Sequence, residues 1–238
     1  AELKTISETT TGEITLHSYA VDLSGTAAQV AAALSGDFAA QYTGKATASD
    51  THDISQLITI NNATTGTITL HDYSVDLSGT AAQVAAALSE TFAGQYTGKA
   101  TASDTHDTAE LKTISETTTG EITLHRYDVA LSGTVAEVKA ALSGTFAAEY
   151  TGAVTVSNAP NVADLKAIND ATSGGITLTT ADGALSGTAA DLVAAFAGTV
   201  TQHTGTVEVS DTHDISQLKT INDNTNGTIT LHDYSVDL

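Results

Sequence analysis

Apolar and glycine positions along this chain follow a fixed period. One aliphatic position recurs at nearly constant spacing: Leu3, Val30, Leu57, Val84, Leu111, Val138, Leu165, Leu192 and Leu218. A glycine before a short β-prone run recurs at spacings that alternate between a longer and a shorter step: Gly12, Gly44, Gly66, Gly98, Gly120, Gly152, Gly174, Gly205 and Gly227. Two unlike units therefore alternate within a period of about 54 residues, which indicates a repeat array whose units bury their apolar faces by stacking on their neighbours.

Each unit is predicted to begin with a helix. Asp53 is followed three positions later by Gln56, and Thr80 by Gln83, which is the spacing of an N-cap residue and its capping-box partner. The other copies carry the same pairs: Thr26 with Gln29, Asp107 with Glu110, Thr134 with Glu137, Asn161 with Asp164, Thr188 with Asp191, and Asp214 with Gln217.

The apolar spacing within the two helices differs. In the first type, Ile54, Leu57 and Ile60 form one stripe and predict a helix of about ten residues that ends before Gly66. In the second type the stripe is rich in alanine, and we expect this helix to run a turn further, with aromatic residues packed in a longer exit segment. These residues are Ala81, Val84, Ala85, Leu88, Phe92 and Tyr96.

Each glycine is followed by an alternating strand pattern, as at 67–70 and 99–102, with apolar residues on one face and threonine on the other. Parallel strands joined by crossover helices of one hand place all helices on the same face. We therefore expect an α/β fold: a β/α repeat solenoid with a single parallel β-sheet, helices on one face, and about 27 residues per coil in alternating pairs. The array spans 1–238, with full pairs at 1–53, 54–107, 108–161 and 162–214 and a partial pair at 215–238.

The charge and composition of the chain exclude several classes of binding partner. The net charge is −20, with 28 acidic and 8 basic residues, so neither nucleic acid nor an anionic membrane offers a charge for this surface to neutralise. No apolar run approaches the length of a membrane span, about 18 residues, so we expect no membrane insertion. The absence of cysteine excludes disulfides, thiol catalysis and a cysteine-based zinc site.

The tetrapeptide at 50–53 (Asp-Thr-His-Asp) recurs at 104–107 and 211–214 and is the first candidate for metal binding. Its last aspartate is already explained as an N-cap, and a zinc site needs three or four converging ligands. A structural turn is therefore the favoured interpretation.

Aspartates in the long loops are candidates for calcium ligands: Asp22, Asp72, Asp76, Asp128, Asp233 and Asp237. Neither the calcium-binding nonapeptide of β-rolls nor the EF-hand spacing occurs, and Arg126 replaces Asp72 in the third copy. We expect calcium to contribute little to folding, and calcium binding remains an alternative.

Two residue types recur at equivalent positions of successive repeats, and each set is expected to form a column when the repeats stack. His17, His71, His125 and His232 recur just after a strand, where Thr179 interrupts them, and we interpret them as surface positions. Outward-facing threonines are expected on the sheet face away from the helices: Thr15, Thr47, Thr69, Thr101, Thr123, Thr155, Thr177 and Thr230, with Glu208 breaking the ladder.

No GxSxG, HExxH, Walker or GxGxxG motif occurs, so we predict no enzyme and assign no catalytic, cofactor-binding or metal residue. Read together, the segments LSGTAAQVAAAL, LKTINDNTNGTITL and SDTHD resemble tandem repeats of very large secreted surface proteins of cyanobacteria and other aquatic bacteria, often described as adhesin-like or hemolysin-like. The resemblance covers the whole chain and implies an extracellular or cell-surface role.

The expected function is therefore a structural or adhesive extracellular repeat protein that forms a rod, surface layer or filament. Because no polar capping repeat is seen at either end of the sequence, we expect the segment to self-associate end to end. Two alternatives remain: a glycan- or calcium-binding module of a secreted adhesin, and a designed consensus scaffold. The sequence does not identify a small-molecule ligand.

Overall fold

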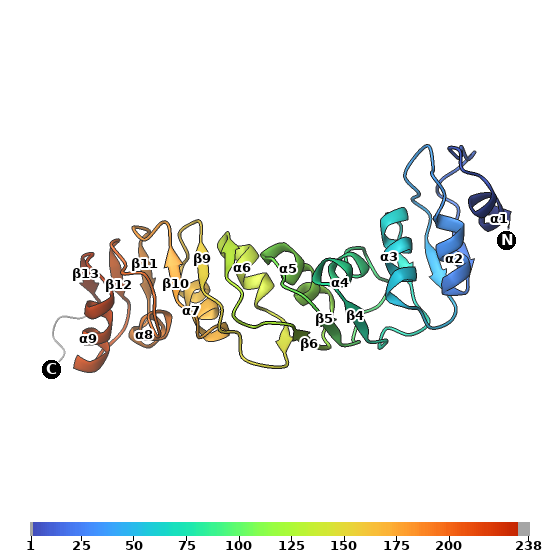
Figure 1. The fold of residues 1–238 in the computed structure, drawn as a ribbon. Coiled ribbons are helices and arrows are strands. Elements are labelled where there is room, and N and C mark those ends of the chain that lie inside the picture. The colour runs from blue at the N-terminus through green and yellow to red at the C-terminus, as the bar shows by residue number, and fades with distance from the viewer. Residues whose placement is uncertain (1, 233–238) are drawn as a thin grey trace. The chain divides into compact units, whose positions relative to one another are not determined.

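The structure is a computed structural model of the chain and describes residues 2–232 (Figure 1). Helices of the two predicted types alternate along these residues. The first type comprises α1 (Glu2–Thr9), α3 (Ile54–Ala63), α5 (Thr108–Thr117), α7 (Val162–Ala171) and α9 (Ile215–Asn224). The second type comprises α2 (Ala27–Leu34), α4 (Ala81–Ala87), α6 (Val135–Ala141) and α8 (Ala189–Ala195).

The predicted caps begin these helices. Asp53 and Thr80 each accept a hydrogen bond from the backbone N–H three positions on, and Gln56 and Gln83 accept one from the cap backbone in return. First-type helices α3, α5, α7 and α9 are ten residues long, as expected. The expectation of a longer second-type helix is wrong: these helices have seven or eight residues, because the chain after each leaves the helix to make a backbone bridge, such as that of Phe92 to Ile68.

The strands are short and all their pairings are parallel. They form four sheets over the described residues, in the orders β1-β2-β3, β4-β5-β6-β8, β7-β9-β10 and β11-β12-β13. Their bounds are β1 (Leu23–Gly25), β2 (Ala46–Ala48), β3 (Ile68–Thr69), β4 (Leu77–Gly79), β5 (Ala100–Ala102), β6 (Glu121–Leu124), β7 (Leu131–Gly133), β8 (Thr145–Phe146), β9 (Val154–Val156), β10 (Ile176–Leu178), β11 (Leu185–Gly187), β12 (Val207–Val209) and β13 (Ile229–Leu231).

The pairing register replaces the expected single sheet of equal coils. Leu23 pairs with Ala46 and Ala46 with Ile68, and both steps are shorter than the expected coil. Leu77 then begins the next sheet soon after Ile68, so one period consists of two pairing steps within a sheet and a short connection into the next sheet. Paired strands lie about 4.8 Å apart, whereas the axes of packed helices lie roughly 8–10 Å apart. Because the chain moves to a new sheet in each period, the strand spacing and the helix spacing do not have to match.

Eight of the nine strands expected after the repeated glycines are present, and the first expected strand is reduced to a single bridge from Ile14 to Phe38. A further set was missed. The Leu-Ser-Gly segments that come just before the N-cap threonines form the edge strands β1, β4, β7 and β11, each of which precedes a second-type helix. These strands are too short to show a period-two pattern.

The glycine ladder marks where one turn of chain lies against the next. A Cβ added at Gly66 would lie 2.2 Å from the carbonyl oxygen of Gly44, and one at Gly120 would lie 2.2 Å from that of Gly98. Thr64 and Thr118 complete the contact by donating their hydroxyls to these same two carbonyls. Glycine recurs here because any side chain would separate the turns.

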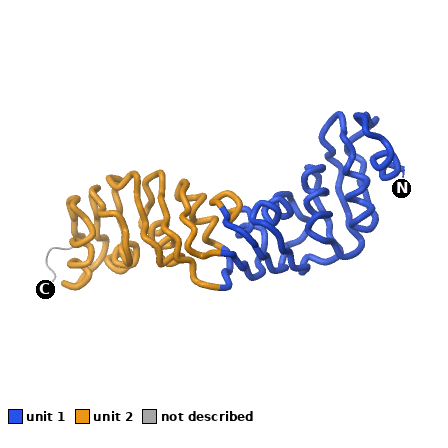
Figure 2. Tube along the Cα trace, viewed as in Figure 1, with its two compact units in different colours: residues 1–106, 113–125, 144–147 blue, residues 107–112, 126–143, 148–238 orange. Residues whose placement is uncertain are grey.

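The chain divides into two compact units, coloured in Figure 2: residues 1–106, 113–125 and 144–147, and residues 107–112, 126–143 and 148–238. In the first unit, α1 to α4 pack each on the next, and in the second α6 to α9 do the same. The recurring aliphatic position supplies the core, with Val30, Leu57, Val84, Leu111, Val138, Leu165 and Leu192 buried. No helix in the described residues combines the length and apolar character needed to cross a membrane.

Candidate functional site

The repeated Asp-Thr-His-Asp segment is built into the backbone of its repeat. Asp50 accepts a hydrogen bond from the first helical N–H of α2, at Ala27 (2.6 Å), and Asp104 accepts the matching bond in α4, at Ala81 (2.7 Å). The last aspartate of each segment caps the following helix, as Asp53 does for α3. Both carboxylates thus satisfy N–H groups that a helix start leaves without partners.

The histidine of this segment is buried and paired with a tyrosine of the next repeat. His52 is 5% exposed, and its Nε2 lies 3.1 Å from the hydroxyl of Tyr96. That hydroxyl donates to the carbonyl of Val75 (2.7 Å), so its oxygen accepts from an Nε2–H of His52. Nδ1 of His52 is then the unprotonated nitrogen, and it is buried without a hydrogen-bond partner.

Burial sets the protonation of this pair. It lowers the pKa of His52 below 6.5, although nearby Asp72, Asp53 and Asp50 act in the opposite direction. Burial also raises the pKa of Tyr96. Both groups are therefore held in their neutral forms, which suits a structural hydrogen bond and provides no poised acid or base.

One copy replaces both members of the pair. Pro160 stands at the histidine position, and His203 stands at the tyrosine position of the following repeat. The Nε2 of His203 lies 2.7 Å from the carbonyl of Gly183, the position that corresponds to Val75. The bond to the neighbouring loop is kept when the side chain that makes it changes, which indicates that the bond itself is what the fold requires.

The loop aspartates predicted as calcium ligands also have local partners. Asp22 accepts from the backbone N–H of Lys45 (3.0 Å), and Asp76 accepts from that of Lys99 (2.9 Å). Asp72 accepts from Ser74, and Asp128 pairs with Arg126. Asp233 and Asp237 lie outside the described residues. Within residues 2–232, no group of three acidic or histidine side chains converges to hold a metal ion.

The predicted surface columns lie at the surface. The four histidines His17, His71, His125 and His232 are exposed. The threonine column is half-buried or exposed, while its neighbours along each strand, such as Ala100 and Ala102 beside Thr101, are buried in the central copies.

Sequence reasoning missed a column of polar side chains in the first-type helices. Ser7 and Asn169 donate to the carbonyls of Ala33 (2.8 Å) and Ala194 (2.9 Å), near the ends of the second-type helices that follow. Asn61 donates in the same way to Ala86 (3.1 Å). The long repeat period would have revealed this column, since Ser7, Asn61, Ser115 and Asn169 are equivalent positions.

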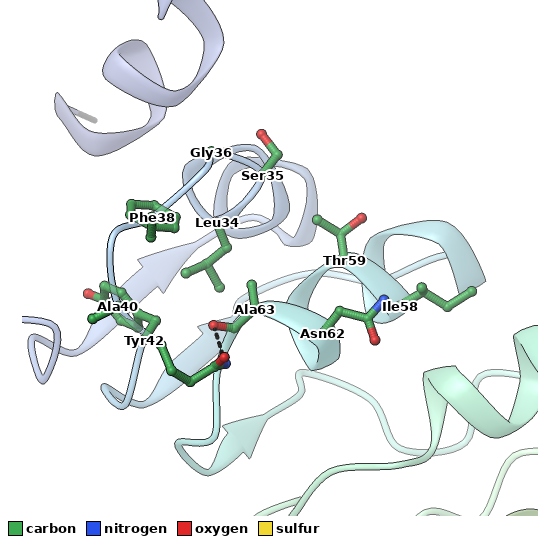
Figure 3. Close-up of a pocket in the computed structure, with 11 residues that line it drawn as sticks. Leu34, Ser35, Gly36, Phe38, Ala40, Tyr42, Ile58, Thr59, Asn62 and Ala63 are labelled. Carbon is green, nitrogen blue, oxygen red and sulfur yellow. Dashed lines mark hydrogen bonds between the residues drawn. The ribbon is translucent and has the colours of Figure 1, made fainter. Parts of the chain in front are cut away.

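A hollow of about 510 Å³ lies between α2 and α3 in the first unit (Figure 3). Leu34, Phe38 and Tyr42 line it from α2 and the segment that follows, and Ile58 and Asn62 line it from α3. The dashed line in Figure 3 marks the amide of Gln41 donating to the carbonyl of Ala63 (2.9 Å). The rest of the wall is Ser35, Gly36, Ala40, Thr59 and Ala63, so no lining residue carries a charge.

The chain was compared with protein-family models, with curated proteins and with solved structures, and no match was found in any of the three.

Proposed function

We propose that this chain is a structural repeat protein of the cell surface or extracellular matrix, without catalytic activity, which assembles by stacking repeats. The observation that supports this proposal is that the residues best suited to bind a metal or catalyse a reaction make structural hydrogen bonds. Asp50, Asp104 and Asp211, with Asn158 at the same position, all bind the first N–H of a helix, and each copy repeats the bond.

Neighbouring repeats are joined by backbone pairing as well as by helix packing. Ile68 pairs with Phe92, Ile122 with Phe146 and Ile176 with Val200, so each first-type strand receives a parallel partner from the segment after the next helix. Backbone pairing depends little on side-chain identity, and further repeats of the same or another chain can be added by it. The net charge of −20 disfavours lateral contact between acidic surfaces.

The proposal is tested by the association state of the purified chain. Sedimentation velocity over the micromolar range and electron microscopy should show linear oligomers whose length grows with concentration. A strictly monomeric protein across this range would overturn the assembly part of the proposal.

A further inference from the structure

The hollow in Figure 3 is the place where one copy departs from the charge pattern of the others. First-type helices α1, α7 and α9 carry an i,i+4 ion pair on this face: Lys4 with Glu8, Lys166 with Asp170, and Lys219 with Asp223. In α3 these two positions are Ile58 and Asn62. The change exchanges two charges for an aliphatic side chain and an uncharged amide.

The facing wall differs in the same direction. Gly36 lines the hollow, and Glu90 occupies its place in the next copy. Gln41 lines it too, and Glu149 occupies that place in the third copy. The hollow is thus the uncharged version of a surface that carries charge in the other copies, within a chain of net charge −20.

Its lining combines apolar faces with short polar groups. Half-buried Phe38 and half-buried Ile58 provide apolar surface, and Leu34 lies buried beneath it. Ser35 and Thr59 donate their hydroxyls within their own helices, to Ala32 and Ser55, and their oxygens remain acceptors. Gln41 and Asn62 add amides that both donate and accept.

From this arrangement we infer that the hollow binds a neutral saccharide. A pyranose ring has an apolar C–H face that packs on Phe38 and a rim of hydroxyls that matches the amides and hydroxyls of the wall. The hollow, at about 510 Å³, falls within the ordinary range of small-ligand sites. A charged sugar would lose hydrating water in the hollow and find no counter-ion among the lining residues, which costs free energy. The site does not depend on the proposed assembly, since all its residues belong to the first unit.

The test uses cellotriose, maltotriose and mannotriose, with trigalacturonate as the anionic comparison, titrated into the full chain and followed by NMR. At least one neutral trisaccharide should bind at up to millimolar concentration and shift the signals of Phe38 and Ile58, and trigalacturonate should bind more weakly. Failure of all three neutral sugars, or equal binding of trigalacturonate, would overturn the inference.

Two variants taken from the chain's own copies localise the binding. The double variant Ile58→Lys with Asn62→Glu restores the ion pair of the other helices, and Phe38→Val copies Val200 of the fourth repeat. Each should weaken binding by about tenfold or more, since each removes one side of the site. Thr67→Glu is the control: it adds a charge outside the hollow, copying the Lys99–Glu121 pair, and should leave the affinity unchanged. Wild-type affinity in either hollow variant would place the sugar elsewhere and overturn the inference.

Discussion

At the scale of single residues, the side chains that the sequence suggested as candidates for metal binding make structural hydrogen bonds. The carboxylates of Asp50 and Asp104 meet helix N–H groups, and the imidazole of His52 meets a tyrosine hydroxyl. Each of these groups also appears in metal or catalytic sites. A metal or catalytic site needs several such groups close together, and the described side chains are instead spread along the repeat.

The carboxylate at Asp104 should be replaceable by an amide. Asp104→Ala should lower the free energy of unfolding by about 1 kcal/mol, because the N–H of Ala81 loses its acceptor. Asp104→Asn should be close to neutral, since Asn158 makes the same bond to Val135 (2.8 Å). Urea denaturation measures both, and a large loss in the Asn variant would show that the charge itself is needed.

Buried His52 should make the fold sensitive to mild acid. Burial depresses its pKa in the folded state below 6.5, so the unfolded chain takes up a proton first as the pH falls. The contribution of His52 to stability is therefore complete above 6.5 and is lost as the pH falls towards the folded-state pKa.

His52→Leu should reduce the loss of unfolding free energy between about pH 7.5 and pH 5.5, a window above the titration of most carboxylates. The matched control is His71→Leu, which removes an exposed histidine of the same unit and should leave the loss as in the wild type. Identical pH profiles for His52→Leu and the wild type would contradict the burial argument.

At the scale of elements, the helices and most strands could be predicted and the sheet boundaries could not. Capping pairs such as Asp53 with Gln56 fixed the helix starts, and the alternation after each glycine located eight strands. The short strands that begin at Leu23 and Leu77 show no periodic pattern in the sequence. The end of one sheet and the start of the next could therefore not be predicted. The columns at Ser7 and Asn61 were accessible from the period and were overlooked.

The glycine ladder gives a prediction at this scale. In Gly120→Ala the new Cβ would lie 2.2 Å from the carbonyl oxygen of Gly98, so the turns must separate, at a cost of about 1–3 kcal/mol. Gly12→Ala tests the same ladder position where the nearest atom, on Thr10, is 3.8 Å away, and should change stability by less than about 0.5 kcal/mol. Chemical denaturation compares the two, and equal losses would refute the close-approach explanation.

At the scale of the whole molecule, the predicted loop aspartates that the structure describes have partners within the chain in both compact units. Asp22 and Asp76 in the first unit bind a backbone N–H, and Asp128 in the second unit pairs with Arg126. A bound ion that recognised only the folded chain would raise its stability by mass action. Among the described residues, the predicted ligands Asp22, Asp72, Asp76 and Asp128 each have a hydrogen-bond or ion-pair partner within the fold.

The most direct measurement is therefore the melting temperature of the full chain in calcium, in zinc and in chelator, for the wild type and for Asp104→Asn. The account predicts melting temperatures within a few degrees of one another in all three conditions, with the variant following the wild type. A rise of tens of degrees with either metal, reduced by Asp104→Asn, would show that the Asp-Thr-His-Asp segments are metal sites and would contradict the structural interpretation.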